Sequence, residues 1–158
     1  MSIRVMAAQI RPEKANFQKN LSKLGDIFEQ LNGVENRPDV LVLPETALTG
    51  YFLEGGVRDV AMTADTFYGF VLHEYRNRAS SDLPDMDIVV GFYELWDGKY
   101  YNSALYATLS FDDNAAKIIH VHRKFFLPTY GVFDEKRFVA RGRTIDAFDT
   151  RSGRSAVL

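Results

Sequence analysis

The feature that most constrains the fold is a change in apolar spacing within the first 44 residues. Residues 3–10 alternate as in a mostly buried strand. From Asn16, a residue type favoured at helix N-caps, apolar residues recur at steps of three and four until Asn32 and Gly33. Residues 39–44 then carry the apolar run VLVL, typical of a strand covered on both faces. The order strand, helix, strand predicts a parallel unit at the start of an α/β domain.

The following segments extend this unit with antiparallel strands. A second helix is expected over residues 65–80, and its apolar side would carry Phe67, Phe70, Val71 and Tyr75. Strands are expected over residues 86–95, 100–110 and 116–124, the first two joined by an Asp97-Gly98 turn. Residues 125–142 predict a loop with one short helical turn, and a last hairpin turns at Gly153. The expected fold class is α/β with a mixed sheet.

Composition excludes several classes of function. Nineteen Lys and Arg against 21 Asp and Glu give a net charge of −2, so no strong positive field recruits nucleic acid or an anionic membrane. With no Cys, these 158 residues hold no disulfide, no thiolate–zinc site and no cysteine nucleophile. The start lacks a signal-peptide apolar region, and no apolar run approaches the roughly 18 residues of a membrane helix. We therefore expect a cytoplasmic protein without nucleic-acid or membrane partners.

Glu45 is the most conspicuous candidate for chemistry. It directly follows the run LVLP, at the carboxyl end of an expected strand, where open α/β sheets present their ligands. A partly desolvated carboxylate at such a place can serve as a general base. The alternative is a surface glutamate that caps the next turn, and the spacing alone leaves both open.

Two further charged residues have similarly open interpretations. Lys124 ends the expected fifth strand, where it could stabilise an oxyanion beside a carboxylate or simply be solvated. Glu135 could equally be a turn residue beside two basic neighbours. His120 and His122 share one face of a strand, as metal ligands could, but no further His or Cys accompanies them. Structural histidines and no metal site are expected.

The remaining polar residues are expected to have structural or solvent-exposed roles. Asn102 is expected to make backbone hydrogen bonds at a turn or strand end. Basic residues gather late in the chain, but interleaved Asp residues predict an ordinary solvated face. These basic residues are Lys136, Arg137, Arg141, Arg143, Arg151 and Arg154.

Taken in order, the motifs resemble the nitrilase superfamily of carbon–nitrogen hydrolases. The resemblance rests on VMAAQI, LVLPETALTGY (residues 41–51), VVGFYE, YYNSA and HRKFFLPTYGVFDEKRF (residues 122–138), and so covers nearly the whole chain. It implies that Glu45 is the general base and Lys124 the catalytic lysine, with Glu135 orienting the site near that lysine. We expect Glu45 and Lys124 to meet at the ends of neighbouring strands, with Glu135 behind the lysine.

The resemblance also implies a fold and a mechanism. The family has a four-layer α-β-β-α sandwich, frequent homo-oligomers and a cysteine nucleophile placed shortly beyond the position of Leu158. Residues 1–158 are therefore expected to be the N-terminal, incomplete portion of such a domain, inactive alone. The implied substrate is a small amide or nitrile, with no metal or organic cofactor.

Three alternatives stay open. The segment LPTYGVFDEKRF is especially similar to the glutaminase domain of glutamine-dependent NAD synthetases, where Tyr130 would match a tyrosine contacting glutamine. LTGYFLEGG is less typical of that subfamily, which favours a stand-alone amidase-type hydrolase. Because the 158 residues lack Cys, a non-catalytic interaction module on the same scaffold is another alternative. The late arginines leave phosphate or nucleic-acid binding as a third.

Overall fold

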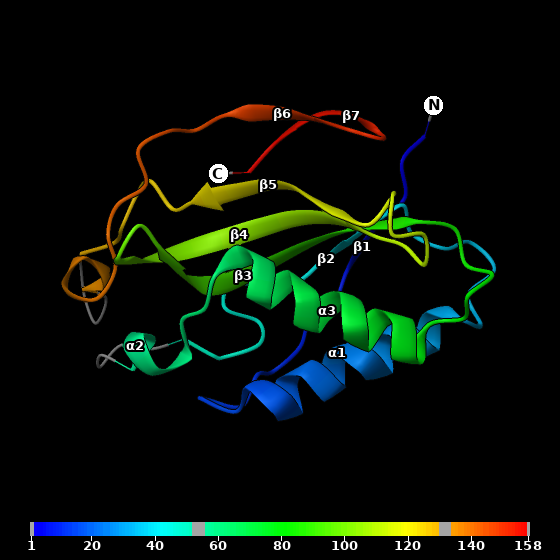
Figure 1. The fold of residues 1–158 in the computed structure, drawn as a ribbon, viewed down its shortest axis with the longest axis horizontal. Helices are drawn as coiled ribbons and strands as arrows, with labels where there is room; N and C mark the ends of the chain where they lie inside the picture. The colour runs from blue at the N-terminus through cyan, green and yellow to red at the C-terminus, as the bar shows by residue number, and fades with distance from the viewer. Residues whose placement is uncertain (1, 52–55, 130–133, 158) are drawn as a thin grey trace.

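The protein is described by a computed structural model over residues 2–51, 56–129 and 134–157. Its centre is a five-stranded mixed sheet in the order β1-β2-β3-β4-β5 (Figure 1). Strands β1, β2 and β3 are parallel, and β4 and β5 continue antiparallel through hairpins. The strands are β1 (Val5–Ala7), β2 (Val40–Val42), β3 (Met86–Trp96), β4 (Lys99–Leu109) and β5 (Lys117–Arg123). The expected α/β class with a mixed sheet is confirmed.

Two helices, α1 (Phe17–Leu31) and α3 (Ala64–Arg78), lie side by side across one face of the sheet (Figure 1). The side chain of Asn16 accepts a hydrogen bond from the Lys19 N–H at 3.2 Å, so the expected N-cap is confirmed. The predicted stripe of α1 is buried from Leu21 onward. At the contact between the helices, the rings of Phe28 and Tyr75 meet edge to face, 5.2 Å apart. Each such side chain contributes about 1.5–3 kcal/mol when it leaves water.

Burial differs from expectation in two places. The first strand is much shorter than residues 3–10, and Val5 is 62% exposed, because β1 is an edge strand and only its helix side is covered. Phe70 is 39% exposed, and its ring meets that of Phe17 edge to face with centroids 5.3 Å apart. A short helix, α2 (Val57–Val60), precedes α3.

The chain after β5 passes to the other face of the sheet (Figure 1). The expected helical turn is the 3-10 helix η1 (Glu135–Arg137). Strands β6 (Ala147–Thr150) and β7 (Gly153–Ala156) form the expected hairpin, but as a separate two-stranded sheet. Among the described residues β7 pairs with β6, and Ala156 at its end is exposed.

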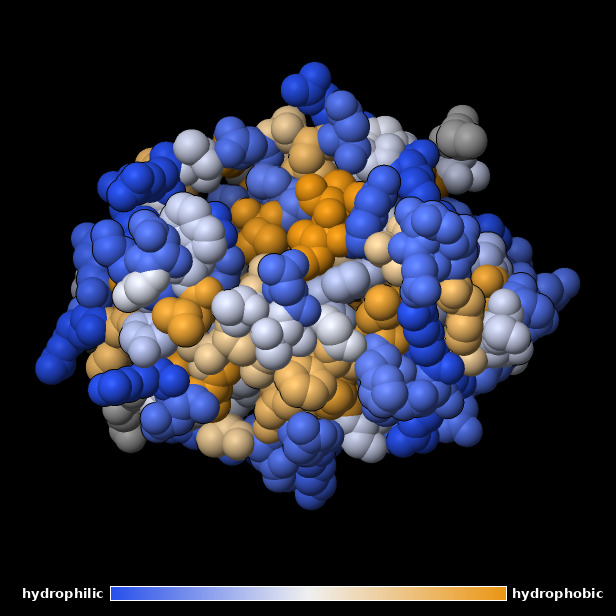
Figure 2. Space-filling view, viewed as in Figure 1, coloured by the Kyte–Doolittle hydropathy of each residue, from blue (hydrophilic) through white to orange (hydrophobic). Residues whose placement is uncertain are grey.

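Figure 2 shows the same view as a surface, largely hydrophilic with an apolar area near its middle, over the strands above α3. Ile118 and Val121 of β5 are partly buried against the core that lies between the sheet and the helices. No helix in the described part of the chain combines the length and apolar character needed to cross a membrane.

Candidate active site

Glu45 lies in a tight turn just beyond the end of β2. Thr46 in that turn has a positive φ of 50°, a conformation that costs energy in a β-branched residue. Its carbonyl accepts hydrogen bonds from the N–H groups of Thr49 and Gly50 at 3.1 and 2.9 Å. The Ala47 N–H donates to the carbonyl of Gly91 in β3 at 3.2 Å. These backbone contacts hold the strained turn against β3.

Gly91 allows the Glu45 turn to cross over β3 toward Lys124. A Cβ at this position would lie 2.7 Å from the Thr46 nitrogen and 2.8 Å from the Glu45 Cα, too close for any side chain. The turn therefore crosses β3 where the strand has no side chain. The expectation that Glu45 and Lys124 follow neighbouring strands is wrong, because β3 and β4 lie between β2 and β5. Glu45 meets Lys124 by crossing over β3.

Lys124 follows β5 directly and is held by its backbone on both sides. Its N–H donates to the Asn102 carbonyl at 2.8 Å, and its own carbonyl accepts from the Gly142 N–H at 2.9 Å. Lys124 Nζ lies 2.8 Å from Glu45 Oε1 and 3.2 Å from Glu135 Oε1. Burial alone would lower the pKa of Lys124, but hydrogen bonds and charge from both glutamates outweigh it and raise that pKa. The lysine is therefore held charged between two carboxylates.

Glu135 lies behind Lys124 and is only 6% exposed. Its carboxylate accepts hydrogen bonds from the Tyr51 hydroxyl and, at 3.1 Å, from Asn102 Nδ2. Burial, followed by the hydrogen bond and charge of Glu135, raises the pKa of Tyr51, so the phenol remains a donor. A buried carboxylate is tolerated where a cation and hydrogen-bond donors are paired with it, and here these are Lys124, Tyr51 and Asn102.

Asn102 and Tyr51 are the site residues that sequence reasoning missed. Asn102 lies within β4, and its Nδ2 donates to both Glu45 and Glu135, so its interpretation as a strand-end residue is wrong. The available signal was an amide side chain that follows two tyrosines within a strand rich in apolar and aromatic residues. Tyr51 ends the same LVLPETALTGY motif that contains Glu45.

A cavity of about 270 Å³ opens beside these groups. Glu45, Asn102, Lys124 and His122 line it, and its apolar walls include Val157. His122 is buried, and its Nε2 finds no hydrogen-bond partner among the residues described. Burial and the neighbouring His120 lower the pKa of His122, against the opposing effect of Asp146.

The other sequence candidates lie elsewhere. The predicted substrate-contacting Tyr130 falls outside the described residues. His120 stacks on Phe148 with ring centroids 4.4 Å apart. Within residues 2–51, 56–129 and 134–157, no group of three or more His, Cys, Asp or Glu side chains could hold a metal ion.

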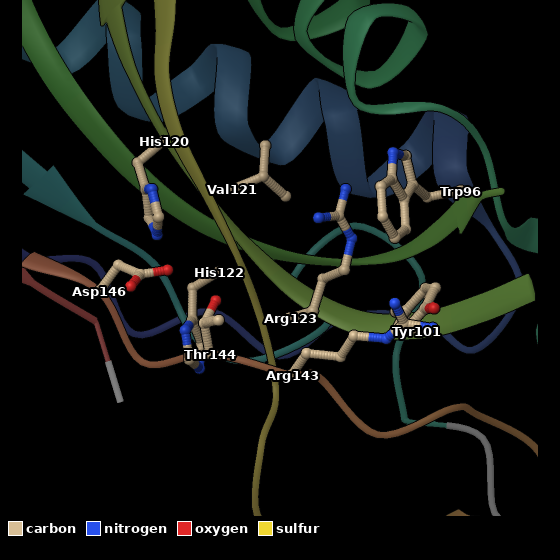
Figure 3. A pocket seen from close by; sticks show the side chains of 9 residues that line it. All are labelled: Trp96, Tyr101, His120, Val121, His122, Arg123, Arg143, Thr144 and Asp146. Carbon is tan, nitrogen blue, oxygen red and sulfur yellow. The ribbon is translucent and has the colours of Figure 1, made fainter. Parts of the chain in front are cut away.

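A second cavity of about 350 Å³ lies around β5 (Figure 3). Arg123 reaches into it with its guanidinium 3.8 Å from the centre of the Trp96 ring. The same guanidinium lies 2.6 Å from the buried carboxylate of Glu94. The contacts of Arg123 with Glu94 and Trp96 are those of a structural residue. The lining of this cavity also contains no lysine beside a carboxylate.

Comparison with known proteins now decides the family. The carbon–nitrogen hydrolase family matches residues 4–158, nearly the whole chain. The chain belongs to this family. It is 30% identical over 146 residues to the glutamine-dependent NAD(+) synthetase of Thermotoga maritima, covering 90% of this chain and 23% of that protein. The enzyme of the same name from Acinetobacter baylyi is 26% identical over 162 residues, 99% of this chain and 26% of that one.

Solved structures agree with this assignment to the carbon–nitrogen hydrolases. The glutamine-dependent NAD+ synthetase of Acinetobacter baumannii superposes with a TM-score of 0.72 at 26% identity, covering 99% of this chain and 27% of that one. Nit3 of Saccharomyces cerevisiae, a member of the nitrilase superfamily, superposes with a TM-score of 0.71 at 20% identity. The match covers 96% of this chain and 53% of Nit3, and it shows the shared fold. The chain spans about a quarter of the length of the curated relatives it matches.

Glu45 and Lys124 are placed where they can take part in acid–base chemistry and in charge stabilisation. Glu45 keeps 47% of its side-chain exposure and borders the cavity, so its carboxylate can exchange a proton with a group bound there. Lys124, charged and fixed, can stabilise negative charge developing on an oxygen. Asn102 and Glu135 hold these two groups in one geometry.

Proposed function

We propose that the full-length protein hydrolyses the carbon–nitrogen bond of a small amide through Glu45, Lys124 and a cysteine that follows residue 158. The observation that carries this proposal is the 2.8 Å contact between Lys124 Nζ and Glu45 Oε1 at the wall of a cavity. The family match supports hydrolysis of a carbon–nitrogen bond. The names of the relatives support the side-chain amide of glutamine as the first substrate to test.

The proposed reaction begins when Glu45 takes the proton of the cysteine thiol. The thiolate attacks the amide carbon, a carbon–sulfur bond forms, and Lys124 stabilises the negative charge on the oxygen. The carbon–nitrogen bond then breaks, and the nitrogen leaves as ammonia with the proton that Glu45 held. Water, deprotonated by Glu45, attacks the thioester, and the acid departs as the thiol regains its proton.

The surrounding groups keep the two reacting residues in place during these steps. Asn102 Nδ2 donates to Glu45, which orients the carboxylate without removing its capacity to accept a proton. Glu135, which accepts a hydrogen bond from Tyr51, accepts a second one from Lys124 Nζ and helps to fix the lysine. Fixing both groups before substrate arrives removes an entropic cost from the reaction.

Two other functions differ from this proposal in what they predict. A stand-alone amidase or nitrilase would act on simple aliphatic amides or nitriles as readily as on glutamine. A non-catalytic module is motivated by the absence of Cys from the 158 residues. A cysteine encoded shortly after residue 158 favours the enzyme, whereas a stop codon there favours the module.

The direct test is Glu45→Gln in the full-length protein, assayed for ammonia release from glutamine, propionamide and propionitrile. The amide keeps the shape of the carboxylate but accepts no proton, so turnover should fall about 10²–10⁴-fold with the fold retained. Glu13→Gln is the matched control, because Glu13 also pairs with lysines, Lys19 and Lys23, but on the surface. Near-normal turnover of Glu45→Gln would remove Glu45 from the mechanism.

Mass spectrometry after treatment with iodoacetamide supplies a second readout. The proposal expects an adduct on one cysteine beyond residue 158 that forms faster than on a denatured control. Absence of any such adduct in native protein would favour the non-catalytic module.

A further inference from the structure

The β6–β7 hairpin lies on the site face of the sheet, defined here as the face that carries Asn102, His120 and Lys124. In this contact the Phe148 ring stacks on His120 and meets Tyr106 edge to face, at 5.1 Å between centroids. Beyond β7, Val157 forms part of the wall of the cavity that Glu45 and Lys124 line. The way the hairpin docks therefore determines where the chain arrives at the site.

Arg151, in the two-residue loop of this hairpin, makes polar contacts between the hairpin and the sheet. Its Nε and Nη2 lie 3.1 and 3.0 Å from Oδ1 of Asp87 in β3, and Nη2 also donates to the Asp85 carbonyl at 3.0 Å. Asp87 is 1% exposed and accepts hydrogen bonds from Tyr106 and Thr108 as well. A buried carboxylate with several charged or polar donors holds its partners in one geometry.

This contact lies far from the reacting groups along β3. Asp87 precedes Gly91, where the Glu45 turn crosses, by four residues, or about 13 Å of strand. The hairpin is thus anchored at its loop, remote from the site, while its other end leads to the cavity. Because β7 pairs with β6 in a sheet of their own, a shift of the loop would move the end of β7 with it.

We propose that Arg151 is a positioning residue of the hydrolase. By fixing the hairpin loop to Asp87, it sets the position from which the chain leaves β7 and reaches the cavity beside Glu45 and Lys124. The inference rests on the proposed function, because the nucleophile is there supplied by the chain that follows. It also gives Arg151 a role different from the solvated face expected for the late basic residues.

The hairpin offers its own matched control. Arg154 lies in β7, three residues from Arg151, is exposed, and makes no ion pair or side-chain hydrogen bond with the residues described. Arg151→Met and Arg154→Met therefore remove the same charge and volume from the same hairpin. The two variants differ in the anchor alone.

The experiment compares Arg151→Met, Arg151→Lys and Arg154→Met in the full-length protein, below the melting temperature of each variant. For Arg151→Met we expect kcat for glutamine to fall tenfold or more, with KM within about threefold, and the alkylation rate of the nucleophile by iodoacetamide to fall in parallel. Arg151→Lys keeps the charge but loses the fork, so its kcat should be intermediate. Arg154→Met should match the wild type.

Each other outcome overturns the inference. If Arg151→Met lowers the melting temperature but leaves kcat and alkylation unchanged in the folded protein, Arg151 is merely structural. If Arg154→Met has the same effect, charge rather than anchoring is responsible. Should Arg151→Met fail to fold, an unchanged kcat in Arg151→Lys overturns the proposal. Full activity of Glu45→Gln would instead overturn the proposed function, whatever the arginine variants show.

Discussion

The two faces of the same sheet have opposite characters. Toward the helices, β3 and β4 present Ile88, Val90 and Leu105, each completely buried in one apolar cluster. On the site face the neighbouring positions carry Asp87 and Asn102, bound by hydrogen bonds and ion pairs. Because side chains alternate along a strand, one strand serves both faces. Substitutions on the two faces should therefore separate stability from chemistry.

The largest effect is expected on the helix side. Phe28→Ala removes a fully buried ring that packs against Tyr75, and should lower the free energy of unfolding by about 3–5 kcal/mol. Chemical denaturation measures this loss. Phe70→Ala, from the exposed flank of α3, should cost much less. A fall in kcat of folded Phe28→Ala protein would show that the helix side also shapes the site.

The next effect belongs to the site face. Glu135→Gln keeps the acceptors for Tyr51 and Asn102 but removes the negative charge beside Lys124, and should lower turnover about 10²-fold through a displaced lysine. Glu135 raises the pKa of Lys124, so its loss lowers that pKa. Since the lysine acts while protonated, the alkaline limit of activity should move to lower pH.

The ion pairs of Lys124 with Glu45 and Glu135 also determine how the free energy of unfolding changes at alkaline pH. Because the folded pKa of Lys124 is raised, its contribution to the free energy of unfolding is complete below the unfolded pKa, about 10.4. It is lost as the pH rises through the folded value. Glu13→Gln is the control for the shift of the alkaline limit of activity in Glu135→Gln. Glu13 pairs with two surface lysines, so its substitution should leave that limit unchanged. An equal shift in Glu13→Gln and Glu135→Gln would show that general surface charge, not contact with Lys124, is responsible.

The helix side was predictable from sequence because its signal is local. The spacing of Leu21, Leu24 and Phe28 predicts both the helix and its buried stripe, and Asp97-Gly98 predicts the hairpin that the positive φ values at both residues confirm. Burial at the edges was not predictable, since the exposure of Val5 depends on β1 having a neighbour on one side only.

The site face was predictable only in part, because its contacts are long-range. The motifs singled out Glu45, Lys124 and Glu135, and the fold brings them together. Asn102 lies in a strand whose register alone aims it at both carboxylates. Arg151 was grouped with other late arginines, because no local pattern indicates a partner 64 residues away.

Gly91→Ala tests the point on the site face where the Glu45 turn crosses over β3, with a smaller effect on stability. The added Cβ would lie within 2.8 Å of the Glu45 turn, so the turn must move, at about 1–3 kcal/mol. Glu45 would move with it, and kcat should fall while the far-UV spectrum stays unchanged. Urea denaturation and turnover measure the two effects. Wild-type turnover in this variant would mean that Glu45 reaches the site without the crossing at Gly91.

Gly69→Ala is the matched substitution on the helix side and should have the smallest effect, of opposite sign. Gly69 lies within α3, exposed, and a Cβ there would meet nothing within 4 Å. Alanine loses less backbone freedom on folding than glycine, so the free energy of unfolding should rise by about 0.5–1 kcal/mol. Turnover should stay at the wild-type value, because α3 lies across the sheet from the cavity. If Gly69→Ala and Gly91→Ala changed turnover alike, the separation of the two faces would be refuted.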